Sequence, residues 1–510
     1  MAQFNVDRIL FAARLLRLRE THTLTLSDLA KRTGLSKGFL SELESGTKSP
    51  GFESLGALAK AFDINRADLL PEKDDEHTNP FRDILDGTLL ASFENKRSTQ
   101  QIVNFITSAP DLSDAIMKAI YKVAETQGLE STFFFPVLLR TYQEKNNNYF
   151  KTLEEDAKRF LKDHRLERGI RINSSDLLKV LQEKFACQVQ EEDLSQYKKL
   201  KYIRSIYIPG RDIFLVNKVL EDNQKAFEIG REIGRKYLGH SGERDLTTPP
   251  TEIRSFTQIW DEFQISYFAG ALFMPQESFT ADIREFFNCE KLDKRLLYDI
   301  MAKYNVSEEM ILHRMTQIMS QEFGIKSLHF MRFQHRGDYR VSEPVLGGKV
   351  INEPVCHLTK YLNIKSMRVL YENNLHERYC RRWGALIALK NLIEDKEEKE
   401  VLREERYCIV QKSKFIGSDN RYICISLSRR MSIDGSIASI TIGFPLDDHV
   451  KSVVKFWNDE NIQEIDVGYT CERCKIDNCA ERVARPTVDD RTNEIKEING
   501  EIKKLMMAFQ

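Results

Sequence analysis

The sequence predicts a mainly α-helical protein of the α+β class, divided into several domains. Its 510 residues exceed what one hydrophobic core usually organises, so about two to four domains are expected. Apolar residues recur at helical spacing, between residues that cap helices, over much of the chain up to about residue 325. Alternating strand patterns follow residue 185 and return between residues 405 and 446.

Composition and charge favour a cytoplasmic protein that does not enter a membrane. The hydrophobic fraction of 41% and the charged fraction of 30% are typical of soluble globular domains. The longest apolar run, around residues 267–275, is far shorter than the roughly 20 residues that a membrane span needs. Nine Cys residues, scattered through a long chain, suit a reducing compartment better than a disulfide framework. Because the net charge is only −1, any nucleic-acid site must be a local patch.

Residues 1–72 contain the capping and stop signals of five short helices. Thr25 is a suitable N-cap for the helix LSDLAKRT, with Asp28 as the capping carboxylate, and Gly34 supplies the left-handed residue that ends it. Ser36 then caps the helix KGFLSELE. Two helices joined by a tight glycine turn form the DNA-reading helix-turn-helix unit.

The second helix of this pair begins with small and polar residues, which allow a helix to enter the major groove of DNA. The residues expected to contact a double-stranded DNA operator are Thr25, Ser36, Lys37, Gly38, Ser41 and Lys48. Residues 1–72 hold ten Lys and Arg against nine Asp and Glu, so one copy should bind DNA weakly. A homodimer, or a dimer of dimers, is therefore expected, because linked copies restore affinity.

The spacing L-A-x-x-x-G-L-S-x-x-x-L-S-x-x-E-x-G begins at Leu29 and is followed by S-P-x-x-x-x-L-x-x-L-A-x-A. This pattern resembles the XRE or lambda-repressor-like family over about 65 residues. The resemblance implies a five-helix fold that binds DNA. A compact helical bundle that binds a protein is the alternative.

A polar, charged segment bracketed by prolines follows, and residues 73–80 are predicted to be a linker between domains. Residues 81–164 carry helical patterns and an aromatic run, STFFFPVLLRTYQEKNNNYF. We expect this region to connect the domains and to pack in a core or a dimer interface. A ligand-binding wall is the alternative for the aromatic run.

Residues 165–325 mix helices with short strands, and one helix contains Arg231-Glu232-Ile233-Gly234-Arg235. The next helix contains FAGALFMP, with Glu262 six residues before Phe268. This order resembles the ImmA/IrrE-type metallopeptidase family, in which the first helix carries His-Glu-x-x-His and the second supplies an acidic third ligand. The resemblance implies a zincin-like α+β fold whose two histidine positions are occupied here by arginine.

Arginine at both histidine positions makes this a degenerate site. A guanidinium has no lone pair to donate to zinc at ordinary pH, so neither bound metal nor hydrolysis by zinc-activated water is expected. Arg231 and Arg235 lie on one helical face, and we expect them to pair with Glu232 and Glu262. An arginine-lined cleft suits phosphate or carboxylate ligands, with purely structural ion pairs as the alternative. The candidate ligand-binding residues are Arg231, Arg235, Glu232, Glu262, Arg204, Arg211, Arg381 and Arg382.

Residues 326–510 are predicted to form a C-terminal α+β domain, in which three strand-like segments precede the motif C-E-R-C-K-I-D-N-C. The thiols of this motif belong to Cys471, Cys474 and Cys479. They have part of the spacing of a zinc site, with a fourth ligand to come from Cys380, Cys424 or a His. Reduced, packed thiols are the favoured alternative, so no metal is expected, and a redox pair comes third.

The longer spacing G-x-x-C-x-x-C-x-x-x-x-C-x-x-R starts at Gly468 and is followed by Pro486. It resembles the C-terminal signature of the short-chain fatty acyl-CoA regulator family. Members of that family join an XRE-type helix-turn-helix, an ImmA/IrrE-like middle and a Cys-rich C-terminal domain, and they include regulators of glyoxylate-cycle and methylcitrate-cycle genes. The resemblance implies that residues 326–510 sense a ligand and that the ligand is a short-chain acyl-CoA.

The last helix has an apolar seam formed by Ile495, Ile498, Ile502 and Leu505. Spacings of three and four make this an a/d seam of two heptads, weakened by Gly500. The seam would pair with a second chain or dock on its own domain, and docking is the slightly favoured alternative.

These features predict a transcription regulator of central carbon and short-chain fatty acid metabolism genes, and not an enzyme. The expected partners are an operator, a second copy of the chain and a small acyl metabolite, with no catalytic residue and no cofactor. The alternatives are an ImmA/IrrE-like antirepressor peptidase and a DNA-binding repressor that needs no ligand.

Overall fold

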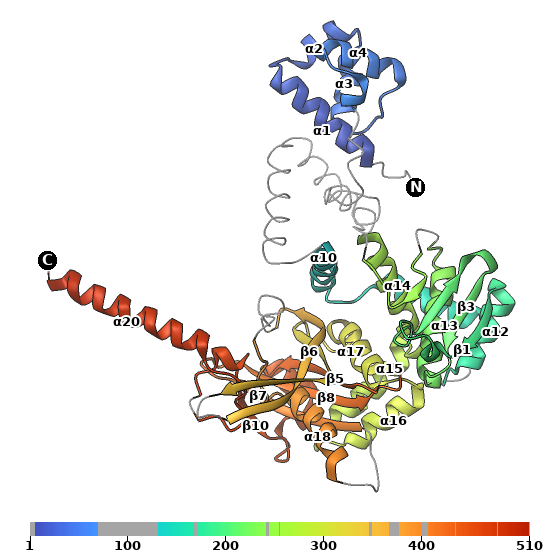
Figure 1. The fold of residues 1–510 in the computed structure, drawn as a ribbon. Helices are drawn as coiled ribbons and strands as arrows, with labels where there is room; N and C mark the ends of the chain where they lie inside the picture. The colour runs from blue at the N-terminus through green and yellow to red at the C-terminus, as the bar shows by residue number, and fades with distance from the viewer. Residues whose placement is uncertain are drawn as a thin grey trace. The chain divides into compact units, whose positions relative to one another are not determined.

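The structure, a computed structural model, describes residues 6–69, 131–166, 171–240, 244–253, 256–345, 349–366, 377–398, 406–433, 435–476 and 478–508. The chain divides into two compact units (Figure 1). The first unit comprises Met1–Leu139 and Glu252–Glu262, and the second comprises Arg140–Thr251 and Phe263–Gln510. The predicted linker 73–80 and residues 81–130 of the predicted helical region lie outside the described residues.

The N-terminal part of the first unit has the five predicted helices. They are α1 (Val6–Thr21), α2 (Leu26–Thr33), α3 (Lys37–Glu44), α4 (Phe52–Phe62) and α5 (Arg66–Leu69). The predicted caps are confirmed: Thr25 and Asp28 form a capping box, and the Ser36 hydroxyl accepts a hydrogen bond from the Phe39 amide. Gly34 ends α2 with a φ of 71°, in the left-handed region that glycine adopts most easily.

A small apolar core fixes the angle between α2 and α3. Leu29, Leu40, Leu43 and Leu58 are fully buried in it. Arg19 on α1 also holds Glu44 at the end of α3, with Nε and Oε1 2.6 Å apart. The helix-turn-helix is therefore a rigid unit whose polar face is left to solvent.

The second unit begins with helices and a small mixed sheet. The helices are α10 (Ser131–Lys145), α11 (Lys151–Asp163), α12 (Ser174–Phe185), α13 (Asp222–Tyr237), α14 (Phe256–Phe273), α15 (Gln276–Asn288), α16 (Lys294–Tyr304) and α17 (Glu308–Glu322), of which α10 and α14 cross the division between units. The strands are β1 (Gln188–Glu192), β2 (Ser205–Ile208), β3 (Ile213–Asn217) and β4 (Thr247–Thr248). Their order is β1-β3-β2-β4, with β1 parallel to β3 and the other pairs antiparallel.

The rest of the second unit is built on a six-stranded sheet with the order β10-β7-β8-β9-β5-β6. The strands are β5 (Leu328–Val345), β6 (Lys349–Ile364), β7 (Arg406–Phe415), β8 (Arg421–Arg430), β9 (Ile437–Pro445) and β10 (Glu464–Val467). The helices are α18 (Gly384–Glu398), α19 (Asp448–Val453) and α20 (Thr487–Ala508), and the short 3-10 turns are η2 (Leu194–Gln196), η3 (Pro209–Arg211), η4 (Lys455–Asn458) and η5 (Cys471–Arg473). Strands β7, β8 and β9 confirm the three predicted strand-like segments, whereas the long hairpin β5–β6 was not predicted.

Helices cover both faces of this sheet, with α17 on one side and α18 on the other (Figure 1). Strand β8 shows the alternation, because Ile423 and Ile425 join the core that contains α17, whereas Tyr422 and Cys424 join the core beneath α18. Because this strand is buried on both faces, its two serines need internal partners: Ser426 donates to Thr441 Oγ1 and Ser428 donates to the Ala388 carbonyl oxygen.

One core crosses the predicted boundary between residues 325 and 326. Phe286 of α15 packs against Phe456 of η4 with ring centroids 5.1 Å apart, and Arg429 of β8 pairs with the fully buried Glu308 of α17 at 3.2 Å. Within the second unit, the zincin-like and C-terminal regions therefore share one core. Among the described helices, none is long and apolar enough to cross a membrane.

Candidate functional site

The residues predicted to contact DNA lie on the exposed polar surface of the helix-turn-helix. Thr25, Ser36, Lys37, Gly38, Ser41 and Lys48 are all exposed. Lys48 is held by the protein, with its Nζ 2.7 Å from Glu42 Oε2 and over the Phe39 ring. Lys37, by contrast, has no ion pair with any residue that the structure describes, so its charge is available to a phosphate or a guanine.

Gly38 leaves open space at the start of α3. A Cβ atom built on Gly38 would meet nothing within 4 Å, so the protein itself does not require glycine there. Helix interiors normally disfavour glycine by about 1 kcal/mol relative to alanine. A small residue at this exposed position is consistent with close approach by another molecule.

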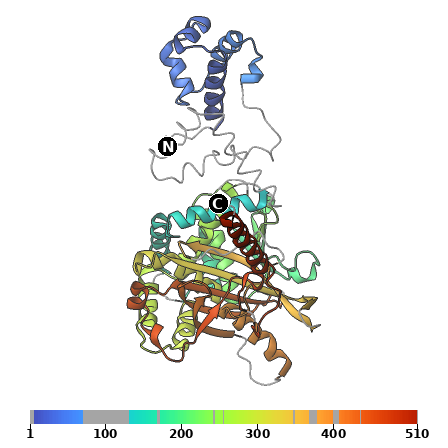
Figure 2. The same ribbon diagram turned by 90° about the vertical axis from the view of Figure 1, so that its left-hand side faces the viewer.

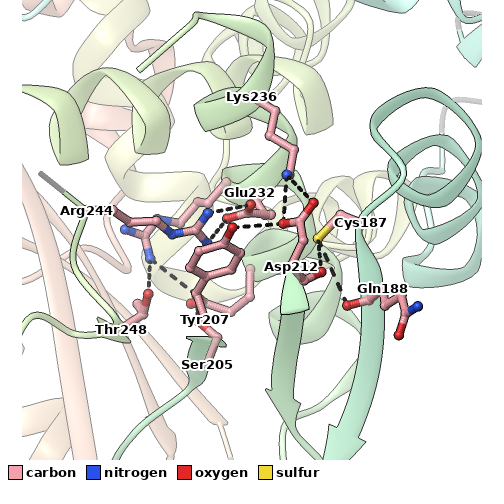
Figure 3. A network of polar contacts seen from close by, with 11 residues as sticks. Cys187, Gln188, Ser205, Tyr207, Asp212, Glu232, Lys236, Arg244 and Thr248 are labelled. Atoms are coloured by element: carbon pink, nitrogen blue, oxygen red, sulfur yellow. Dashed lines mark hydrogen bonds and ion pairs between the residues drawn. The ribbon is translucent and has the colours of Figure 1, made fainter. Parts of the chain in front are cut away.

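The degenerate site lies on α13 in the second unit. A Cβ at Gly234 would lie 2.9 Å from a ring carbon of Phe268, and one at Gly230 would lie 3.2 Å from a ring carbon of Phe273, so these glycines let α13 approach α14 closely. This packing turns the opposite face of α13, which carries Glu232, toward strand β2 and the loop before β4 (Figure 3). Arg231 lines the same cavity.

The Glu232 carboxylate is paired with Arg244, a residue that the sequence patterns did not single out. Arg244 binds it in a bidentate pair, with Nη1–Oε1 and Nη2–Oε2 distances of 3.0 and 2.6 Å. The Arg244 guanidinium also stacks on the Tyr207 ring, 3.1 Å from the ring centroid (Figure 3). Burial raises the pKa of Glu232, and the charge and hydrogen bonds of Arg244 oppose that rise.

Arg231 turns away from Glu232 and toward the preceding turn of α13. Its Nη1 donates to Glu228 Oε2 at 3.2 Å and to Thr248 Oγ1 at 3.1 Å. Glu228 also accepts from Ser205 Oγ at 3.1 Å and lies 3.7 Å from Arg204 Nη1. Arg204 is thus the second of the candidate arginines that the structure brings to this site.

A second polar layer fixes the Tyr207 ring on which Arg244 stacks (Figure 3). The Tyr207 hydroxyl donates to Asp212 Oδ1 at 2.9 Å, and Lys236 Nζ lies 3.1 Å from the same oxygen. Burial opposes ionisation of Asp212, but the hydrogen bonds from Lys236 and Tyr207 outweigh it, so the pKa of Asp212 is lowered. Burial raises the pKa of the neighbouring Cys187 to about 12, so this thiol is protonated and unreactive at neutral pH.

Arg244 is thus the bidentate partner of Glu232, and the nearby charge of Arg235 also opposes the rise that burial produces in the pKa of Glu232. Side chains at neighbouring positions of a helix diverge, so Arg231 reaches Glu228 one turn back and leaves Glu232 to the loop residue Arg244. Arg235 lines the same cavity. Glu262 is the last residue of the first unit and is half-buried on α14.

These residues do not fit a zinc ion. Guanidinium groups stand at both positions where the related peptidases have histidine, and the Glu232 carboxylate is already bound by a third guanidinium. The remaining cavity has a volume of about 20 Å³, which is room for about one water molecule. The site holds its own internal cation, Arg244, and has no space for a nucleotide-sized ligand.

The other predicted arginines lie elsewhere. Arg211 is exposed in the turn between β2 and β3. Arg381 and Arg382 line a separate cavity of about 10 Å³, together with the thiols of Cys380, Cys471, Cys474 and Cys479. The structure thus does not gather the predicted ligand-binding residues into one site.

The Cys-rich motif is folded around an arginine. Arg482 donates to the carbonyl oxygens of Cys471 at 2.9 Å, Cys474 at 3.0 Å and Ile476. Burial raises the pKa of Cys380 to about 11, and it raises the pKa of Cys471 as well. Among the residues that the structure describes, no three His, Cys, Asp or Glu side chains are grouped in a way that could hold a metal ion.

Known protein families cover both candidate sites. Residues 15–69 match the helix-turn-helix family, and residues 182–316 match the IrrE N-terminal-like domain family. The HTH-type transcriptional regulator PrpR of Mycobacterium tuberculosis is 24% identical over 341 residues, which cover 61% of this chain and 64% of the relative. The match therefore spans less than two thirds of that relative.

A solved structure of a Mycobacterium tuberculosis transcriptional regulator is 15% identical, with a TM-score of 0.44, and covers 68% of this chain and 92% of that one. The two family matches contain the exposed α3 surface and the Arg231–Arg244 site respectively. The chain thus combines an XRE-type helix-turn-helix domain with an ImmA/IrrE-like domain.

Proposed function

We propose that this chain is a cytoplasmic, DNA-binding transcription regulator whose second unit binds a small acyl metabolite, most simply a short-chain acyl-CoA. The observation that carries the proposal is the exposed surface of α2 and α3, where Lys37 and Gly38 stand free at the start of the recognition helix. The 24% identity to an HTH-type transcriptional regulator also supports a role in transcription. The acyl-CoA ligand rests on the resemblance of the C-terminal motif.

The chemistry of the ImmA/IrrE-like domain supports a role other than proteolysis. Peptide hydrolysis in that family depends on a metal-activated water, and the residues at this position cannot bind the metal. The buried Glu232–Arg244 pair instead joins α13 to the loop before β4. We therefore assign this site to the structure of the sensor and not to catalysis.

A cavity of about 590 Å³ in the second unit is our candidate for the effector site, because ligand pockets usually have volumes of about 300–1,000 Å³. It lies between α11 and the first turn of α15. Its apolar lining consists of Leu161, Leu166, Ile172, Ala271, Leu272 and Pro275, with Tyr149 and Tyr304 beside them. Such a wall suits an acyl chain.

The charges around this cavity indicate which part of an acyl-CoA would enter it. Glu154 is paired with Arg314, Glu277 with Lys158 at 2.6 Å and Glu155 with Lys151 at 3.6 Å. With Glu322, the lining holds four carboxylates against two lysines. Phosphates are poorly matched to this lining. We infer that the acyl and pantetheine end enters the cavity and that the nucleotide end stays outside.

Regulation then requires that the effector bind one arrangement of the DNA-reading domains better than another. Affinity for a single site is expected to be low, since the helix-turn-helix domain carries almost no net charge. Binding as a pair on a two-fold operator would make the response depend on how the two domains are held.

Lys37→Ala is expected to weaken DNA binding by about 1–3 kcal/mol if Lys37 contacts a base. The measurement is fluorescence anisotropy with fragments that the full-length protein selects from a genomic library. Lys60→Ala is the matched control, because Lys60 is equally exposed but lies on α4. Gly38→Ala should leave thermal stability unchanged or slightly raised and still weaken binding. Unchanged affinity in both α3 variants would remove α3 from the interface.

Acetyl-CoA or propionyl-CoA is expected to raise the melting temperature more than free CoA, because only these compounds place an acyl chain in the apolar cavity. A ligand at a hundred times its Kd stabilises the folded protein by about 2.7 kcal/mol. Ser278→Trp, which puts an indole into the cavity, should abolish the shift, whereas Ser195→Trp on the exposed turn η2 should not. If no CoA compound shifts the wild type at millimolar concentration, a repressor that needs no ligand becomes the better assignment.

A further inference from the structure

The C-terminal helix α20 exposes an apolar stripe that the described residues of its own domain leave half-exposed or more. Ile495, Ile498, Ile502 and Leu505 are 49%, 52%, 48% and 61% exposed. Met506 and Met507 beyond them are also exposed. Figures 1 and 2 show α20 as one straight helix that extends from the domain of the six-stranded sheet. The expected docking of this helix on its own domain is therefore wrong.

The stripe has the spacing of a coiled-coil seam. Steps of three, four and three residues assign Ile495 and Ile502 to a positions and Ile498 and Leu505 to d positions. Arg491 occupies the preceding d position, which limits the apolar seam to two heptads. β-Branched residues at a with Leu at d, as in the second heptad, favour a two-stranded parallel coiled coil, whereas Ile at d, as at Ile498, favours more strands. Gly500 lies on the outer face of the helix, where it lowers helix propensity without interrupting the seam.

The charges on α20 are distributed unevenly between the two sides of this seam. At 100° per residue, the side that precedes the seam carries four exposed carboxylates, which belong to Asp490, Glu494, Glu497 and Glu501. Lys504 also lies on this side. The opposite side carries two exposed lysines, Lys496 and Lys503, and the half-buried Asp489. Its e positions next to the seam, which are Thr492, Asn499 and Met506, carry no charge.

We propose that α20 is the pairing helix of this chain and that its partner is α20 of a second copy, in parallel orientation. In a parallel pair Glu494 and Glu501, at g positions, face the uncharged e residues Asn499 and Met506 of the other copy. In an antiparallel pair g faces g, so these carboxylates would face the same carboxylates of the other copy and repel them. Exposed charges change affinity little, but such patterns select orientation.

The pairing stands independently of the proposed function, although it would supply the two-fold arrangement that an operator needs. Two heptads bury a small area, and isolated helices of this length are marginally stable in water. The chain should therefore exist in a monomer–dimer equilibrium that depends on concentration.

The test is sedimentation velocity of the full-length protein over a wide range of concentration. Ile498→Glu with Ile502→Glu is expected to raise the dimer Kd at least about tenfold, because two carboxylates would enter the seam of each helix. Asn493→Glu with Met507→Glu adds the same charge to the outer face and should leave the Kd within about twofold of wild type. The helix is exposed, so neither variant should lower the melting temperature. A monomeric wild type, or a seam variant that dimerises like wild type, would overturn the proposal.

Orientation is tested by single cysteines. In a parallel pair Leu505 faces Leu505 of the other copy, so Leu505→Cys alone should form an intermolecular disulfide under mild oxidation. In an antiparallel pair Leu505 would face Ile495, and only a mixture of Leu505→Cys and Ile495→Cys proteins would crosslink efficiently. The wild type is the control, since its own nine cysteines are buried or half-buried. Crosslinking in the mixture alone would contradict the parallel geometry. Both experiments read association directly, so a chain that pairs but binds no DNA would contradict only the proposed function.

Discussion

Arg244→Ala is expected to destabilise the second unit by about 3–5 kcal/mol, the usual cost of leaving one member of a buried ion pair alone. Glu232 is 3% exposed, and both of its oxygens are bound by Arg244. The substitution also removes the guanidinium stacked on Tyr207. Urea unfolding of the full-length protein, followed by far-ultraviolet circular dichroism, measures the change.

Two companion variants separate the lost charge from the lost packing. Glu232→Gln with Arg244→Ala replaces the stranded carboxylate by a neutral amide, so the double variant should be more stable than Arg244→Ala alone. Arg244→Lys keeps the charge but loses the bidentate geometry and the flat stacking surface, and it should fall between Arg244→Ala and wild type. A loss below about 1 kcal/mol in Arg244→Ala would show that Glu232 is stabilised by other groups.

The pH dependence of Arg244→Ala has a defined sign. Burial already raises the pKa of Glu232 in the folded protein, and removal of Arg244 takes away the main opposing effect. A carboxyl whose pKa is higher in the folded than in the unfolded state favours folding at low pH and loses that contribution as pH rises through the folded pKa. The defect should therefore be largest at neutral pH and shrink on mild acidification. The double variant with Glu232→Gln should not show this change.

Local sequence patterns predicted the elements of this protein well. Caps and stops such as Thr25, Ser36 and Gly34 act on neighbours within four residues, so they could be read without knowing the fold. The alternating strands β7 to β9 were recognisable for the same reason. The hairpin β5–β6 was missed because its sequence is rich in charged and aromatic residues, and its pairing depends on partners elsewhere in the chain.

The chemistry of the candidate site was predicted, but only part of its membership was. The arginines at 231 and 235 indicated an ion-pair site, because residue type alone decides what can bind a metal. Arg244 could not be assigned, because it stands in a polar loop where no periodicity shows which way a side chain points. Cys380 meets Cys471 and Cys474 only through the fold, since about ninety residues separate them in the chain.

Arg314→Met is expected to lower the free energy of unfolding of the second unit by about 3–5 kcal/mol, because it removes the partner of Glu154, which lines the candidate effector cavity. Arg314 on α17 is 1% exposed and binds Glu154 on α11 through two contacts of 2.6 and 2.8 Å. Its Nε also donates to the Met274 carbonyl oxygen at 3.0 Å. Methionine fills a similar volume, so the loss would reflect the stranded Glu154 carboxylate and the lost hydrogen bonds more than an empty space.

The Tyr267 hydroxyl makes this network more than a simple pair. It donates to Glu154 Oε1 at 2.6 Å and accepts from the Phe150 amide at 3.2 Å, which joins α14 to α11. Burial, with the Glu154 charge beside it, raises the pKa of Tyr267, so the hydroxyl stays protonated and continues to donate. Loss of Arg314 should therefore loosen α11, and with it Lys151 and Lys158 at the cavity.

Glu154→Gln in the Arg314→Met background is the matched test of this explanation. A neutral amide can still accept from Tyr267 and leaves no buried charge, so much of the lost stability should return. Hydrogen exchange should locate the defect of Arg314→Met in residues 151–163 of α11 and leave β8 and β9 protected. If the double variant is no more stable than Arg314→Met, the stranded carboxylate is not the cause, and Arg314 stabilises the unit chiefly through its bonds to Met274 and Gln317.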